Sequence, residues 1–176
     1  MPEVSAALAE VHRSLGLPAD YAQRRGLSLQ SEAAINSLVT IAYTDDGRAI
    51  QLAPPAAEAW MRLNRAAEAA VIQLIPISGF RSIARQTEII RAHLESGRPL
   101  EDILRLVAAP GYSEHHTGHA VDLTTLNDPP LEAGFALTPA FAWLNTQATR
   151  FGFHLSFPKN NAHGIAYEPW HWCWRP

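Results

Sequence analysis

The pattern of apolar positions predicts an amphipathic helix in the first half of the chain. Its apolar residues recur at the three- and four-residue spacing of one helical face: Trp60, Leu63, Ala67 and Ala70. Pro54-Pro55 stands at the start of this stretch, where proline is tolerated because the first helical turn leaves its backbone N–H groups unpaired anyway. We therefore expect a helix over residues 54–70 with one buried face.

A β-hairpin is predicted just before this helix. Two apolar segments, residues 38–43 and 49–52, flank Asp45-Asp46-Gly47. An Asp-Gly pair readily adopts the positive φ angles that a tight hairpin turn requires. These segments should therefore form two antiparallel strands.

The rest of the chain alternates irregularly between the two kinds of pattern. Helices are expected over residues 5–15, 82–95, 99–108 and 138–150, and strands over 71–77, 119–125, 153–157 and 170–172. Because helices and hairpins are mixed without a regular βαβ alternation, we expect an α+β fold.

Size and composition restrict the class of protein. A chain of 176 residues with 47% hydrophobic and 18% charged residues fits one globular domain, residues 1–176. Its net charge of −3 argues against nucleic acid or an anionic membrane as a partner. The start of the chain lacks the pattern of a signal peptide, and the single Cys173 fits a reducing compartment, so a cytoplasmic protein is expected.

Side chains that could bind a metal ion are concentrated between Ser113 and Asp122, where three histidines and an aspartate surround Gly118. An aspartate within an apolar strand is costly to bury without a partner, which a metal ion would supply. Strand alternation and a sharp turn at the glycine favour His115 and Asp122 as ligands over the other two histidines, His116 and His119.

Two other interpretations of this cluster remain open. The histidines could lie on the surface, with Asp122 serving as a cap or in an ion pair. Alternatively, His115 and His119 could bind zinc from one helix, although that helix would contain Gly118 and lack the glutamate of the His-Glu-x-x-His motif.

A second segment, Glu168-Pro169-Trp170-His171, lies near the end of the chain. His171 would complete a set of three zinc ligands, and Glu168 could act as a general base. The neighbouring tryptophans could equally indicate a packed core strand. Cys173 is a possible fourth ligand, but a packed thiol is the favoured interpretation.

Arg81 belongs to a third segment, Ser78-Gly79-Phe80-Arg81-Ser82, which is followed by Gln86. The arginine follows a glycine at a predicted strand-to-helix turn, where its guanidinium could bind a carboxylate through two hydrogen bonds. The alternative is an ion-paired or solvated arginine, the commoner situation for any single arginine.

Together the three segments resemble the D-Ala-D-Ala carboxypeptidase (VanY-like) family of zinc peptidases, the group that contains the vancomycin-resistance enzymes. The pattern Ser-x-His-x-x-Gly-x-Ala-x-Asp is matched from Ser113 to Asp122, and Glu-x-Trp-His from Glu168 to His171. The segment Ser78–Ser82 with Gln86 matches a third motif. The resemblance covers roughly residues 77–172, and residues 1–70 carry no recognised motif.

This resemblance implies a small, mainly antiparallel sheet that bears the zinc site and is flanked by helices, as in hedgehog domains and D-Ala-D-Ala peptidases. The catalytic core would be residues 71–176, with one zinc ion per chain. The implied roles are zinc ligand for His115, Asp122 and His171, catalytic base for Glu168, contact to substrate or oxyanion for Arg81, and substrate binding for Ser113, Gln86, Ser82 and Trp170.

The leading hypothesis is therefore a zinc carboxypeptidase that releases C-terminal D-alanine from peptidoglycan peptides or muropeptides. We favour L,D-activity on tetrapeptides in cytoplasmic wall recycling, because a cytoplasmic D,D-enzyme would deplete the pentapeptides needed for crosslinking. The alternatives are D,D-activity on D-Ala-D-Ala ends, a phage-type L-Ala-D-Glu endopeptidase, and a zinc-bearing binding module without catalysis. The presence of both Glu168 and Arg81 argues against a silent module.

Overall fold

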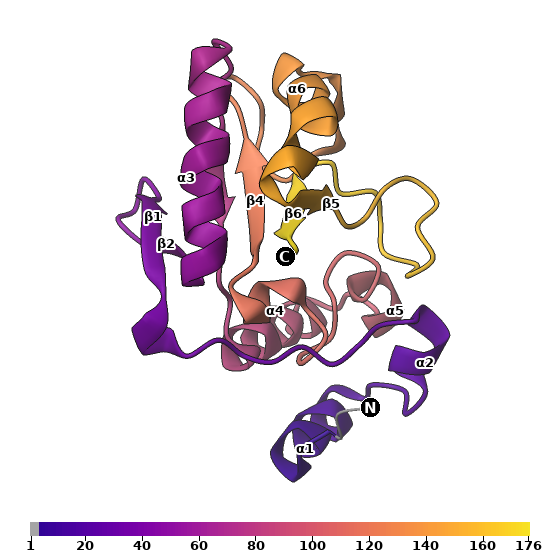
Figure 1. Ribbon diagram of the computed structural model, residues 1–176. Coiled ribbons are helices and arrows are strands. Elements are labelled where there is room, and N and C mark those ends of the chain that lie inside the picture. Colours follow the sequence, from indigo (N-terminus) through magenta and orange to yellow (C-terminus); the bar gives the residue numbers. More distant parts are fainter. Residues whose placement is uncertain (1–3) are drawn as a thin grey trace.

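The computed structural model describes residues 4–176, and its strands form two sheets (Figure 1). The hairpin consists of β1 (Val39–Tyr43) and β2 (Ala49–Leu52). The larger sheet consists of β3 (Ile75–Ser78), β4 (Ala120–Thr124), β5 (Phe153–Leu155) and β6 (His171–Trp174). Its order is β3-β4-β6-β5, and each neighbouring pair is antiparallel.

Helices surround these sheets, which confirms the α+β class and the small antiparallel sheet. The α-helices are α1 (Ala6–Leu15), α2 (Tyr21–Arg25), α3 (Pro54–Ala69), α4 (Ile83–Glu95), α5 (Leu100–Ile103) and α6 (Pro139–Gln147). The 3₁₀-helices are η1 (Ile35–Ser37), η2 (Glu114–Thr117), η3 (Ala133–Leu137) and η4 (Ala148–Phe151). Within residues 4–176, no helix has both the length and the apolar character needed to cross a membrane.

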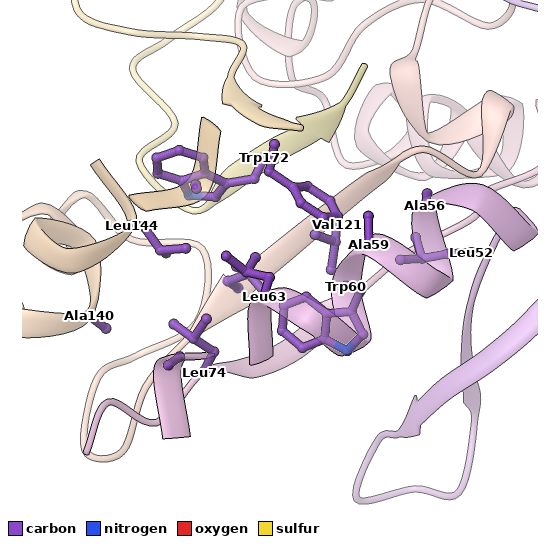
Figure 2. Packing of buried hydrophobic residues seen from close by; sticks show 14 of the residues in the cluster. Leu52, Ala56, Ala59, Trp60, Leu63, Leu74, Val121, Ala140, Leu144 and Trp172 are labelled. Carbon is purple, nitrogen blue, oxygen red and sulfur yellow. The ribbon is translucent and has the colours of Figure 1, made fainter. Parts of the chain in front are cut away.

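The main hydrophobic core lies between one face of the four-stranded sheet and helices α3 and α6 (Figures 1 and 2). Trp60 and Leu63 of α3 pack with Val121 of β4, and Leu144 of α6 and Trp172 of β6 belong to the same cluster. The predicted amphipathic face of α3 is thus the face that is buried.

A second core holds the helices on the other side of the molecule together. Ile90 of α4 and Ile103 of α5 pack with Leu15 at the end of α1 and Tyr21 of α2. The two cores are distinct, and the site described below lies between the sheet and this helical part.

Strand β4 separates the apolar core from the polar site. Val121 and Leu123 belong to the main core, whereas Asp122 points away from it, because side chains alternate along a strand. Ala120 is fully buried but lies outside the main core cluster, as expected for a residue on the face of Asp122.

Several predicted boundaries are confirmed. The hairpin turns at Gly47, whose φ is 81°. Helix α1 begins after Ser5, whose hydroxyl accepts a hydrogen bond from the Leu8 amide, and it ends at Gly16 with φ 71°. Helix α4 likewise begins after Ser82, whose hydroxyl accepts from the Arg85 amide.

The strand predicted over residues 71–77 is wrong at its start. Val71 has a φ of 59° and is 92% exposed, and the amides of Val71 and Ile72 donate to the carbonyls of Glu68 and Ala67. These bonds satisfy the last carbonyls of α3, so the apolar pair closes the helix and the strand begins only at Ile75.

Further boundaries differ from the prediction. The helix expected over 99–108 is only α5, since tight turns follow Ile103, and the helix expected over 138–150 becomes 3₁₀ after Gln147. The last strand starts at His171 instead of Trp170, because the His171 amide donates to the Glu168 carbonyl and closes a turn there.

Candidate active site and metal centre

Three buried side chains from different elements converge on one point. His115 comes from η2, Asp122 from β4 and His171 from the first position of β6, and each offers a ligand atom within 4.8 Å of the others. Antiparallel pairing places Asp122 directly opposite His171 in the register. The sheet therefore fixes two members of the cluster, and the turn before β4 supplies the third.

The Asp122 carboxylate lies between the two imidazoles. Its Oδ2 is 3.2 Å from His115 Nε2, and its Oδ1 is 3.0 Å from His171 Nδ1. Burial alone would raise the pKa of Asp122, but the charge of His115 and hydrogen bonds from both imidazoles hold it well below its usual range. One carboxylate and two imidazoles are a donor set that zinc takes in catalytic sites.

Each imidazole is oriented through the ring nitrogen that faces away from Asp122. His115 Nδ1–H donates to the Gly79 carbonyl at 2.7 Å, and His171 Nε2–H donates to Glu114 Oε2 at 2.9 Å. Burial lowers the pKa of His171, but hydrogen bonds with Asp122 and Glu114 raise it to about 10 overall. A cation on Nδ1 would displace the proton from that nitrogen.

Glu168 reaches the same point from a tight turn. Pro169 and Trp170 occupy the turn, which places Glu168 Oε2 3.9 Å from His171 Nδ1. Burial raises the pKa of this carboxyl to about 7, against the lowering effect of His171 and Arg81. A cation at the cluster would lower that pKa, since positive charge favours the carboxylate.

Arg81 follows β3 and points toward the cluster. Its Nη2 lies 3.8 Å from Asp122 Oδ2 and also donates to Ser78 Oγ at 3.2 Å. Its Nη1 donates to Gln86 Oε1 at 3.1 Å, and the Gln86 amide donates in turn to the Ala108 carbonyl at 2.6 Å. Gln86 thus anchors the guanidinium beside the cluster.

These groups open onto a cavity of about 390 Å³, which falls in the usual size range of small-ligand pockets. Its walls include the cluster and five further residues that the sequence singled out: Arg81, Gln86, Ser113, Glu168 and Trp170. Ser82 is not among the lining residues, and its hydroxyl instead caps α4. The remaining lining residues are the polar His93, Arg98 and Glu114 and the apolar Ile89, Leu106, Val107, Ala108, Leu131, Phe157, Ile165 and Ala166.

The other two histidines of the motif lie outside the cluster. His116 is fully buried, where its Nδ1–H donates to the Arg81 carbonyl at 2.6 Å and its Nε2 accepts from the Gly111 amide at 3.1 Å. His119 packs edge-on against Trp174. The role of His116 in holding the Arg81 backbone was not anticipated, because it depends on the close packing of two loops.

Cys173 is buried beside the cluster but does not join the group of potential ligands. Its Sγ–H contacts the Trp174 carbonyl at 3.7 Å. Burial raises the pKa of the thiol well above its usual range, which keeps it protonated. These features match a packed thiol.

The N-terminal hairpin supports the loops of the site from behind. The Ala53 amide donates to the Gly118 carbonyl at 2.8 Å, and the Phe80 amide donates to the Gln51 carbonyl at 2.7 Å. A Cβ at Gly79 would lie 2.4 Å from that Gln51 carbonyl oxygen. Because β2 approaches so closely, only glycine fits at position 79, whose carbonyl accepts the hydrogen bond from His115.

The sequence profile of the VanY family, described as D-alanyl-D-alanine carboxypeptidase, matches residues 49–176. The chain belongs to this family. The matched region begins at the first residue of β2, so β2 and α3 lie inside it although residues 1–70 carry no recognised motif.

Relatives and solved structures agree with this assignment. The putative carboxypeptidase YodJ of Bacillus subtilis (strain 168) is 34% identical over 66% of this chain, which spans only 43% of that relative. The structure of the LdcB LD-carboxypeptidase, described as revealing the basis of peptidoglycan recognition, is 30% identical with a TM-score of 0.72. It covers 82% of this chain, which in turn covers 70% of LdcB.

A third comparison bears on the metal. A mutant of the vancomycin resistance D,D-pentapeptidase VanY, solved in complex with Zn(II), is 25% identical to this chain. Its TM-score is 0.60, and the match covers 84% of this chain and 85% of that structure. Together with the buried His/Asp/His cluster, this likeness suggests zinc as the metal.

Proposed function

We propose that this protein is a zinc-dependent carboxypeptidase that releases C-terminal D-alanine from peptidoglycan stem peptides. The observation that carries the proposal is the convergence of a three-residue donor set, a buried carboxyl and an arginine on one cavity. Membership of the VanY family supports the same reaction class.

The residues present fit a catalytic zinc ion. His115 Nε2, Asp122 and His171 Nδ1 would hold it, and three protein ligands leave a position for water or substrate. Zinc held in this way would lower the pKa of a water molecule and polarise the scissile carbonyl.

Glu168 is placed to move protons during hydrolysis. Its carboxylate lies beside the donor set and lines the cavity. From there it can accept a proton from the attacking water and then donate it to the departing amine of D-alanine. Burial favours this role, because it raises the pKa of the Glu168 carboxyl and so makes its carboxylate a stronger base.

Arg81 provides the positive charge for substrate binding. A carboxypeptidase must recognise a free terminal carboxylate, and a guanidinium can bind one through two hydrogen bonds. With Gln86 and Ser78 holding its nitrogens, Arg81 loses little side-chain freedom on binding. Ser113 and Trp170 line the adjoining wall and would contact the peptide.

Between the two stereochemical subtypes, we favour L,D-activity on tetrapeptides. The likeness to the LdcB LD-carboxypeptidase supports this preference, with 30% identity and a TM-score of 0.72. D,D-activity on D-Ala-D-Ala ends is the second candidate, supported by the family description and by the likeness to VanY.

Mass spectrometry of defined muropeptides after incubation with the zinc-loaded protein tests both candidates. We expect the tetrapeptide to lose one alanine, and to lose it faster than the pentapeptide does. Release from pentapeptide alone would replace the L,D assignment with the D,D one. Cleavage between L-Ala and D-Glu would identify an endopeptidase, and intact peptides throughout would leave only a binding function.

A further inference from the structure

Glu114 is a partly buried carboxylate that the proposed reaction does not use. It is the first residue of η2, immediately before His115, and its side chain is 18% exposed. Its Oε2 accepts from His171 Nε2–H at 2.9 Å. It therefore connects the segment that carries His115 with the strand that carries His171.

The geometry separates Glu114 from the ligands themselves. His171 presents Nδ1 to Asp122 and Nε2 to Glu114, and these two nitrogens lie on different edges of the ring. The group of mutually close ligand atoms among the described residues contains Asp122 but not Glu114. Glu114 thus contacts the imidazole from the side away from the donor set.

We propose that Glu114 is a positioning residue that fixes the ring orientation and tautomer of His171 for metal binding. An acceptor at Nε2 keeps the proton on that nitrogen and leaves the Nδ1 lone pair directed at the cluster. A carboxylate in this place also increases the basicity of the ligating imidazole. The inference rests on the proposed zinc site but not on any peptide substrate.

The ion pair of Glu114 with Arg175 provides a matched control. Arg175 Nη2 donates to Glu114 Oε1 at 3.3 Å, and the arginine side chain is 55% exposed. If Glu114 acted only through this ion pair near the end of the chain, removal of Arg175 would have the same effect as removal of Glu114.

Zinc affinity, measured by chelator competition on the whole chain, distinguishes the two cases. We expect E114A to bind zinc about 10- to 100-fold more weakly, the usual cost of losing an outer hydrogen-bond partner. E114Q keeps an acceptor oxygen and should recover part of the loss, and R175A should stay close to the unsubstituted protein. Equal affinity in E114A and the unsubstituted protein, or equal losses in E114A and R175A, would overturn the proposal.

Nitrogen-15 NMR of the zinc-loaded protein reports which ring nitrogen of His171 binds zinc and which carries the proton. A purely structural role of Glu114 would leave these signals unchanged. We expect zinc on Nδ1 of His171 and a slowly exchanging proton on its Nε2, with the opposite arrangement at His115. E114A should lose the protection of that proton, whereas R175A should keep it. Zinc on Nε2 of His171 would overturn the inference.

These measurements also separate this inference from the proposed function. If the unsubstituted protein binds no zinc, both the zinc peptidase proposal and the inference about Glu114 fail. If zinc binds normally and E114A is unaffected, only the inference fails. If zinc binds and E114A weakens it while no D-alanine is released, the positioning role stands and the substrate assignment fails.

Discussion

The two segments that build the metal centre support their histidines in different ways. His115 donates its outer N–H to a backbone carbonyl, that of Gly79, which β2 and β3 hold in place. His171 donates its outer N–H to a side chain, that of Glu114. One half of the centre is therefore oriented by the packing of the main chain, and the other by a single carboxylate.

This difference predicts how each half responds to substitution. The support of His115 can be disturbed only by moving the backbone, which also costs folding stability. The support of His171 can be removed by changing one side chain, with the backbone left in place. Substitutions on the two sides should consequently separate effects on stability from effects on the metal.

Removal of either imidazole should give the largest effect, which is the loss of zinc. The effect should be the same for His115 and for His171. We expect H115A and H171A to lose stoichiometric zinc, because two remaining protein ligands do not make a stable zinc site. Metal analysis after dialysis checks this. H119A is the control and should keep one zinc per chain, since His119 packs against Trp174 outside the cluster. Full zinc in H115A would exclude His115 as a ligand.

Substitution of Glu168 should separate catalysis from metal binding. We expect E168A to release D-alanine about 10²-fold or more slowly, the scale for loss of a positioned base, and to retain zinc. Steady-state kinetics with tetrapeptide measure the change. E88A removes an exposed glutamate on α4 and should leave the rate unchanged. An undiminished rate in E168A would contradict the assigned role.

Disturbance of the backbone support should lower stability first. A Cβ at Gly79 would meet the Gln51 carbonyl oxygen at 2.4 Å, so G79A should destabilise the fold by about 1–3 kcal/mol in urea unfolding. Zinc affinity should fall with it, because the carbonyl that orients His115 must move. G134A is the matched control, since its Cβ would meet no atom nearer than 3.6 Å. Equal stability of G79A and G134A would contradict this account.

The smallest effect is expected at the cap of α4. S82A removes the hydroxyl that accepts from the Arg85 amide, which should cost about 1 kcal/mol of stability. Zinc affinity should stay unchanged, because Ser82 does not line the cavity. T138A removes the corresponding cap of α6 and should show a similar loss in the same unfolding assay. A clear drop in zinc affinity for S82A alone would place the hydroxyl in the site.

Local signals predicted much of the fold. The Asp-Gly turn, the proline pair in the first turn of α3 and the serine caps of α1 and α4 all act within a few residues, so the sequence alone reveals them. The error at Val71 arose from an ambiguous local signal. An apolar β-branched pair is typical of a strand, but here it closes a helix through two backbone hydrogen bonds.

The candidate site shows the same division. Strand alternation and the glycine turn indicated His115 and Asp122. The residue types around Glu168, His171 and Arg81 offered a third ligand, a base and a carboxylate clamp, and the resemblance to a family then implied one role for each of them. The positions of Glu114 and His116 could not be predicted, because their contacts join loops that are distant in sequence. The contribution of the hairpin behind Gly79 is tertiary for the same reason.

Anomalous diffraction at the zinc edge from crystals of the zinc-loaded protein tests the central claim most directly. The account predicts a single strong peak bounded by His115 Nε2, an Asp122 carboxylate oxygen and His171 Nδ1, with Glu114 hydrogen-bonded to the opposite nitrogen of His171. A peak between His171 Nε2 and Glu114, or zinc held without His115, would contradict it.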